Sequence, residues 1–205
     1  MKILIIGATG RTGQRALSQL LRRGDEVTAF VRRPAAVTAS GNRLSIVVGD
    51  ARDASAISRA VVGQDAVFTA FGPRSLKKDD VQEVMMRHLV DAMKTQSVRR
   101  LVNLSSWALR PARLDFVTRT IVTPLLARHV MADKERGEAI LFASDLDYVN
   151  IRPGRLLNSN ARGNVKASVD GSGLKQTITR EDLAAFMIGQ LSDNAWVRRS
   201  VFVGY

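Results

Sequence analysis

The chain has 205 residues, no cysteine and 45% hydrophobic residues. This length fits one domain, and the lack of cysteine excludes a disulfide framework and thiol chemistry. The formal net charge of +12 suggests anionic partners, yet the arginines are scattered. No long basic run, zinc-ligand spacing or aromatic RNA-binding motif is present, so we expect no nucleic-acid partner. No apolar run reaches the roughly 18 residues of a membrane span, so we expect a cytoplasmic protein without a membrane partner.

The glycine loop near the start of the sequence organises the rest of the chain. Residues 2–6 form a short apolar run of the kind found in buried parallel strands, and glycines follow at Gly7, Gly10 and Gly13. A helical apolar repeat then extends to Gly24, a typical C-cap residue. Gly7 allows a tight turn, Gly10 lets a pyrophosphate approach the backbone, and Gly13 lets the helix pack closely on the sheet. Strand, glycine loop and helix together predict dinucleotide binding; the alternative is a structural turn that binds no ligand.

The second expected strand, residues 26–31, is followed by Arg32 and Arg33. This position, about 20 residues past the glycine loop, meets the adenosine ribose in a dinucleotide fold. A carboxylate there would repel a 2′-phosphate, whereas a guanidinium binds it with a charge-assisted bond of roughly 1.5–3 kcal/mol. We therefore predict that NADP(H) is preferred over NAD(H), with Arg11 as a further contact. The alternative is that these arginines are surface charges.

A third strand is expected at residues 44–48, before Asp50 and Ala51. Asp50 lies either near the adenine edge or in a turn, and the pattern leaves both interpretations open. A helix over residues 53–62 is expected to be capped by Asp53.

The fourth expected strand, residues 65–71, ends at Gly72-Pro73-Arg74. Gly72 would let the backbone pass close to the cofactor, and Arg74 would reach its phosphates. Residues 75–96 show the apolar spacing of a longer helix, on which we expect His88 at the surface.

Serines follow the fifth expected strand, residues 99–104, at the edge where open α/β sheets place their ligands. Ser106 is a candidate to hydrogen-bond a substrate carbonyl or the nicotinamide amide. The alternative is a loop serine pair, Ser105 and Ser106, that satisfies nearby backbone groups.

The second half of the chain is expected to continue the alternation of strands and helices. We expect a loop to about residue 113, a helix interrupted near Pro124, and a second helix to about residue 143 that carries Lys134. A sixth strand follows at residues 147–151.

Residues 155–173 are rich in Asn, Ser and Gly, which predicts a substrate-side loop with a short strand around residues 165–169. Thr179 opens the last helix in the style of a capping box, and a final strand covers residues 201–203. The whole pattern predicts a single Rossmann-like domain over residues 1–205 with a doubly wound parallel sheet. A small substrate-side region is expected around residues 152–178.

Several short motifs, taken together and in order, resemble the atypical short-chain dehydrogenase/reductase superfamily, in the branch of NmrA-like proteins and biliverdin reductase B (flavin reductase). The resemblance covers almost the whole chain. Its motifs are Gly-Ala-Thr-Gly-Arg-Thr-Gly (7–13), Val-Arg-Arg (31–33), Val-Val-Gly-Asp (47–50), Phe-Gly-Pro-Arg (71–74), Leu-Ser-Ser (104–106), Ile-Arg-Pro-Gly (151–154) and a tail segment (169–184).

The resemblance implies a role for each matching residue. The residues implied at the pyrophosphate are Gly7, Thr9, Gly10, Arg11 and Thr12. Those implied further along the cofactor are Arg32 at the 2′-phosphate, Asp50 and Ala51 at the adenine, and Gly72 and Arg74 at the middle. Those implied at the nicotinamide are Ser106, Pro153 and Gly154. Gly13, Arg33, Phe71 and Ser105 complete the expected cofactor site.

The sequence also departs from the superfamily pattern. Conventional members pair a tyrosine with a lysine four residues later, and the lysine lowers the pKa of the tyrosine. Here Val130 stands four residues before Lys134, and neither Tyr148 nor Tyr205 is a convincing substitute. In the biliverdin reductase B pattern a histidine follows the proline of the sixth strand, where this chain has Gly154.

We therefore expect an NADPH-dependent reductase that transfers a hydride to a planar conjugated acceptor such as FMN, FAD, a quinone or a biliverdin-like molecule. Flavin-reductase-like members lack that tyrosine, and their acceptors take a proton from solvent. Ser106 and Lys134 are the expected catalytic residues, and the protein is expected to be a monomer or homodimer. One alternative is a non-catalytic NADP(H) sensor of the NmrA type. A second alternative is a nucleotide-sugar epimerase or dehydratase, which the missing tyrosine disfavours.

Overall fold

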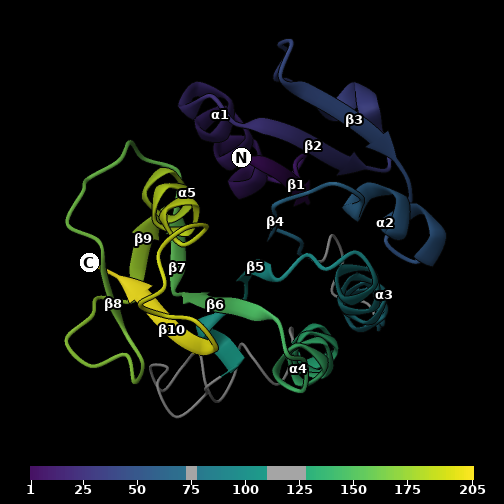
Figure 1. Ribbon diagram of the computed structural model, residues 1–205. Helices are drawn as coiled ribbons and strands as arrows, with labels where there is room; N and C mark the ends of the chain where they lie inside the picture. The colour runs from purple at the N-terminus through teal and green to yellow at the C-terminus, as the bar shows by residue number, and fades with distance from the viewer. Residues whose placement is uncertain (73–77, 110–127) are drawn as a thin grey trace.

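The fold is an α/β sandwich built on one large sheet (Figure 1). The computed structural model describes residues 1–72, 78–109 and 128–205. The strands of the large sheet are β1 (Lys2–Ile6), β2 (Glu26–Val31), β3 (Leu44–Val48), β4 (Ala66–Thr69), β5 (Arg100–Leu104), β6 (Asp147–Pro153), β8 (Lys166–Ser168) and β10 (Arg199–Gly204). The helices are α1 (Arg11–Arg23), α2 (Ala54–Val61), α3 (Val81–Thr95), α4 (Arg128–Phe142) and α5 (Arg180–Gly189), with short 3₁₀ turns η1 (Pro34–Ala36) and η2 (Trp107–Leu109).

The strand order of the large sheet is β3-β2-β1-β4-β5-β6-β10-β8. Every neighbouring pair is parallel except β8 and β10, so the predicted doubly wound parallel sheet is confirmed with one antiparallel edge strand. The chain runs outward from β1 through β2 to β3 and then returns to β4 on the other side of β1. Ligands of open α/β sheets bind at such a switch point, beyond the carboxyl ends of the strands.

Helices cover both faces of the sheet. Ile3 and Ile5 point to the face covered by α1 and α5, and Leu4 and Ile6 point to the face covered by α2, α3 and α4 (Figure 1). All four side chains are at most 1% exposed. A strand that buries both faces needs an unbroken apolar run, which explains why β1 lacks polar alternation.

The helix ends predicted from the sequence are largely confirmed. Gly24 ends α1 in the left-handed conformation, with φ 89°. The Asp53 carboxylate accepts from the backbone N–H groups of Ser55 and Ala56 at the start of α2. The Thr179 hydroxyl accepts from the N–H of Asp182 at the start of α5.

Several expected boundaries are wrong. Strand β6 ends at Pro153 rather than at residue 151, and β10 begins at Arg199 rather than at residue 201. Strand β4 ends at Thr69 rather than at residue 71, and α3 begins at Val81 rather than at residue 75. The late start of α3 has a tertiary reason, because a carboxylate from α4 fixes its first turn, as described below. The residues around Pro124 lie outside the described part of the chain.

The expected loop over residues 155–173 also contains a strand that sequence reasoning missed. Strand β7 (Arg155–Leu157) pairs in parallel with β9 (Thr177–Thr179) in a separate two-stranded sheet. Segments of three residues carry no periodicity of their own, so only their pairing reveals them. The short strand expected around residues 165–169 is confirmed as β8.

Within the part of the chain that the structure describes, none of the helices combines the length and apolar character needed to cross a membrane.

Candidate functional site

A cleft of about 740 Å³ follows the carboxyl edge of the sheet and brings together most of the predicted site residues. It extends from the glycine loop and the end of β2 to the end of β5 and helix α4. The predicted residues that line it are Gly7, Thr9, Gly10, Arg11, Thr12, Arg32, Arg33, Asp50, Ala51, Phe71, Gly72, Ser105, Ser106 and Lys134.

The glycine loop has the backbone geometry that a phosphate cradle needs. Gly7 has φ 92°, and a Cβ there would lie 2.7 Å from the backbone of Ala70. A Cβ on Gly13 would lie 2.0 Å from the Gly7 carbonyl oxygen, so α1 approaches the loop too closely for any side chain. At Gly10 the nearest atom to such a Cβ is 3.3 Å away, and this exposed glycine faces the cleft. Gly10 is the exposed glycine of the loop, so its backbone is the part that a phosphate in the cleft would approach.

The N-terminus of α1 is built to receive an anion. Its N-cap residue, Gly10, provides no side-chain cap, and its first turn contains no acidic residue. The first helical residue is instead Arg11, a cation placed against the positive end of the helix dipole. Free N–H groups and an added positive charge make this helix end a fitting partner for a pyrophosphate.

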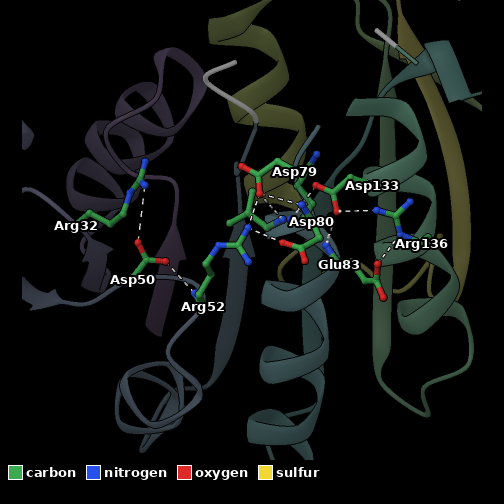
Figure 2. A network of polar contacts seen from close by, with 10 residues as sticks. Arg32, Asp50, Arg52, Asp79, Asp80, Glu83, Asp133 and Arg136 are labelled. Atoms are coloured by element: carbon green, nitrogen blue, oxygen red, sulfur yellow. Dashed lines mark hydrogen bonds and ion pairs between the residues drawn. The ribbon is translucent and has the colours of Figure 1, made fainter. Parts of the chain in front are cut away.

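At the end of the cleft formed by β2 and β3, Arg32 and Asp50 face each other (Figure 2). The Arg32 Nη1 lies 3.8 Å from an Asp50 carboxylate oxygen, and both side chains are about half exposed. The other Asp50 oxygen accepts from the backbone N–H of Arg52 at 2.9 Å. Asp50 thus has the turn role that one interpretation foresaw and also lines the cleft, and its place near the adenine stays a prediction.

Sequence reasoning missed Arg52 and Asp79, which line the cleft beside Asp50. Arg52 forms ion pairs with Asp79 and Asp80, which immediately precede α3 (Figure 2). The contact joins the β3–α2 loop to the start of α3 across the cleft. The only sequence signal was the Asp-Asp pair before a helix, which by itself indicates a helix N-terminus.

The serines at the end of β5 play different parts. The buried Ser105 hydroxyl donates to the Glu138 carboxylate, and the Ser105 N–H donates to the Ile151 carbonyl at 2.7 Å. The Ser106 hydroxyl oxygen accepts from the Ala108 N–H at 3.2 Å, as the alternative of a loop serine foresaw. Ser106 also lines the cleft, and among the described residues its hydroxyl proton has no acceptor, so it can serve a ligand.

Helix α4 carries Lys134 into the cleft next to Val130, one turn earlier. The Lys134 Nζ donates to the Leu104 carbonyl at 3.0 Å. Desolvation lowers the pKa of Lys134 to about 8, although the charges of Glu138 and Asp133 act in the opposite direction. Since Val130 faces the same cleft, the position that holds a tyrosine in conventional members is apolar here.

Glu138 lies buried below the end of β5, next to Ser105. It is 4% exposed and forms an ion pair with Arg152, which is 3% exposed. It also accepts from Asn150 Nδ2 at 2.9 Å, and Asn150 in turn accepts from Asn103 at 2.7 Å. This buried network fixes the hydroxyl direction of Ser105, and no motif in the sequence announced it.

Three of the predicted residues that the structure describes do not line the cleft. Gly13 packs under the loop rather than lining the cleft, as its close approach to Gly7 requires. Pro153 is buried at the end of β6, and a Cβ on Gly154 would lie 2.3 Å from the Gln176 carbonyl oxygen. Neither Pro153 nor Gly154 is among the residues that line the cleft. Arg74 lies outside the described residues.

Comparison of the sequence with known protein families shows the family of this chain. The model of a family described as NAD(P)H-binding matches residues 7–194. The chain belongs to this NAD(P)H-binding family. The match covers the glycine loop, nearly all the residues that line the cleft and the whole of α5, and it confirms the NAD(P)-binding family that the motifs resemble.

Two relatives align with this chain over most of its length. One is an uncharacterized chloroplastic protein, At2g34460, from Arabidopsis thaliana, with 30% identity over 93% of this chain and 71% of the relative. Another is the oxidoreductase stcQ from Emericella nidulans, with 30% identity over 97% of this chain and 81% of the relative.

Solved structures share the fold of this family member. A short-chain dehydrogenase/reductase from Veillonella parvula in complex with NADP has a TM-score of 0.82 at 20% identity, covering 100% of this chain and 94% of the other. ChuY, an anaerobillin reductase from Escherichia coli O157:H7, has a TM-score of 0.80 at 21% identity, covering 100% of this chain and 97% of the other.

Proposed function

We propose that the protein is an NADPH-dependent reductase that transfers a hydride to a planar conjugated acceptor, such as a flavin, a quinone or a biliverdin-like molecule. The observation that carries the proposal is the composition of the cleft. A phosphate cradle and paired arginine side chains occupy one end, and Val130 with Ser106 and Lys134 occupies the other. The relatives named as an oxidoreductase and a reductase support the same reaction class.

The residues of the cleft divide into binding and positioning roles. The N-terminus of α1 and the glycine loop hold the pyrophosphate, Arg32 holds the 2′-phosphate, and Asp50 holds the Arg32 guanidinium in place. When bound, NADPH supplies the hydride. Ser106 and Lys134 orient the nicotinamide or the acceptor above the end of β5. Rate enhancement then rests on proximity and orientation.

The apolar Val130 argues for an acceptor that needs no proton from the protein. A ketone substrate requires an acid at the carbonyl oxygen, and no phenol stands at this position. A flavin or tetrapyrrole takes its proton from solvent, which reaches the open cleft. The same observation disfavours epimerase or dehydratase chemistry.

The first test mixes the purified protein with NADPH and FMN and follows the loss of NADPH absorbance, with NADH as the paired control. Faster loss with NADPH than with NADH supports a flavin-reductase-like enzyme and the role of Arg32 together. The proposed reductase activity is contradicted if the protein binds NADPH tightly but NADPH absorbance does not fall with FMN or with a panel of quinones and tetrapyrroles.

A non-catalytic NADP(H) sensor is the second candidate, because Lys134 is tethered to the Leu104 carbonyl and lacks its tyrosine partner. This candidate predicts NADPH binding without turnover. It also predicts a protein partner whose affinity changes between NADP⁺ and NADPH, measurable by pull-down in the two cofactor states.

A further inference from the structure

Arg180 is a cleft residue that no motif in the sequence assigned to ligand binding. It is the first residue of α5, and it lines the cleft together with Leu156 of β7. Its Nη1 donates to the Leu156 carbonyl at 3.2 Å and to Asn158 Oδ1 at 2.7 Å. Both acceptors are uncharged, so the side chain is held in position while its charge stays available.

The charges nearest to Arg180 on helix α1 are also positive. Desolvation is the largest cause that lowers the pKa of Arg180, and the charges of Arg11 and Arg15 lower it further. Arg11 lines the same cleft from the start of α1. Two guanidinium groups on different helices therefore raise the positive potential at this point of the cleft.

The two carboxylates that follow Arg180 in the sequence bind other partners. Glu181 forms ion pairs with Arg15 at 3.6 Å and Arg22 at 3.7 Å on α1. Asp182 accepts from the Tyr205 hydroxyl and from the backbone N–H of Arg162. Within residues 1–72, 78–109 and 128–205, the structure shows no ion pair for Arg180 or Arg11.

The arginines at the adenosine end provide a contrast within the same cleft. Arg32 faces Asp50, and Arg52 faces Asp79 and Asp80. Arg33 at the end of β2 also has no ion pair among the described residues, but where α1, α5 and β7 meet two such arginines, Arg11 and Arg180, lie near each other. The partly desolvated Arg180, next to the exposed Arg11, is stabilised when a bound anion takes the place of the missing carboxylate.

We propose that Arg180 forms an anion subsite that binds an acidic group of the acceptor, next to Arg11 at the pyrophosphate end of the cleft. Arg180 and Leu156 come from the region that follows β6, whereas the N–H groups of α1 already serve the pyrophosphate. The favoured acceptor is then a planar molecule with a phosphate or carboxylate side group, rather than a neutral quinone. This inference rests on the proposed function for the planar, reducible part of the acceptor.

FMN and riboflavin test the subsite, because they share the isoalloxazine ring and differ in the phosphate. Binding of each flavin to the NADP⁺-loaded protein is measured by quenching of flavin fluorescence, and turnover with NADPH is measured separately. We expect the wild-type protein to bind FMN about tenfold more tightly than riboflavin. In the Arg180→Gln variant, which keeps a polar side chain for Asn158, we expect this ratio to fall to near one while NADPH binding is unchanged.

Arg155→Gln is the matched control, because Arg155 is an exposed arginine on β7 that does not line the cleft. It should keep the FMN preference, and Arg180→Lys should keep part of it. If Arg180→Gln weakens NADPH binding and leaves the FMN ratio intact, the anion is the cofactor pyrophosphate and the proposal is wrong. Equal affinities for both flavins in the wild type, or no binding of either, also overturn it. If the wild-type protein prefers FMN but does not turn over NADPH, the anion subsite is supported and the proposed reductase activity is contradicted.

Discussion

Arginine side chains around the cleft differ mainly in whether a carboxylate neutralises them. Arg32 and Arg52 have acidic neighbours, whereas Arg11 and Arg180 show none among the described residues. A paired arginine is held in one geometry, and an unpaired one attracts anions more strongly. The identity of the side chain alone, which is all that the sequence gives, does not distinguish these two situations.

Arg32→Ala tests the role of this residue at the 2′-phosphate. Removing a charge-assisted contact should weaken NADPH binding about 10-fold or more and leave NADH binding nearly unchanged. The ratio of kcat/KM for NADPH over NADH measures this preference. Arg59→Ala, at an exposed position on α2 outside the cleft, is the control. An unchanged ratio would count against the proposed NADP(H) preference.

Lys134 gives the site a pH dependence. Because desolvation lowers its pKa to about 8, the folded protein loses this charge as the pH rises through that value. The pKa in the unfolded chain is higher, so the contribution of this lysine to the free energy of unfolding increases above about pH 8. Binding of the anionic cofactor should weaken over the same interval.

A pH profile of the NADPH Kd checks this, with an inflection near pH 8 that Lys134→Met removes. Lys94→Met, at an exposed position on α3, should leave the inflection in place. A wild-type profile that is flat between about pH 7 and pH 9.5 would show that the ammonium does not hold the cofactor.

At the scale of elements, helix α3 depends on a cap that comes from another helix. Its own N-cap residue, Asp80, makes no capping bond. Asp133 of α4 instead accepts from the N–H groups of Gln82 and Glu83, both at 3.0 Å (Figure 2). This contact joins α3 to α4 next to Lys134, and it explains why α3 begins later than its apolar repeat.

Asp133→Asn should lower the free energy of unfolding by about 1–2 kcal/mol, because the amide offers one acceptor oxygen where the carboxylate offers two. Urea denaturation measures the change. Asp91→Asn, at an exposed position on α3, should alter stability by less than about 0.5 kcal/mol. If both variants lose the same free energy of unfolding, the Asp133 cap does not stabilise α3.

Across the whole molecule, a buried polar network connects the middle strands of the sheet. Thr69 of β4 donates to Asn103 of β5 at 2.6 Å, Asn103 donates to Asn150 of β6, and Asn150 donates to Glu138 of α4. Arg152 supplies the opposite charge to Glu138. The network lies directly under the site, so its integrity sets the position of Ser105.

Glu138→Gln should destabilise the fold by about 3–5 kcal/mol, because it leaves the Arg152 charge buried without a partner. Thermal and urea unfolding measure the loss. Glu135→Gln, at an exposed position on the same helix, is the control. A Glu138→Gln variant as stable as the wild type would mean that the ion pair is replaced without penalty.

The sequence by itself determined the alternation of strands and helices, the glycine loop, the helix caps and most of the residues that line the cleft. These features follow from local rules, namely apolar periodicity, the conformational freedom of glycine and capping side chains. Only the tertiary structure decided the β7–β9 pair, the start of α3, the Glu138 network and the lack of an acidic partner for Arg180 among the described residues. Each of these depends on partners far apart in the chain, whose contacts leave no periodic or local pattern in the sequence.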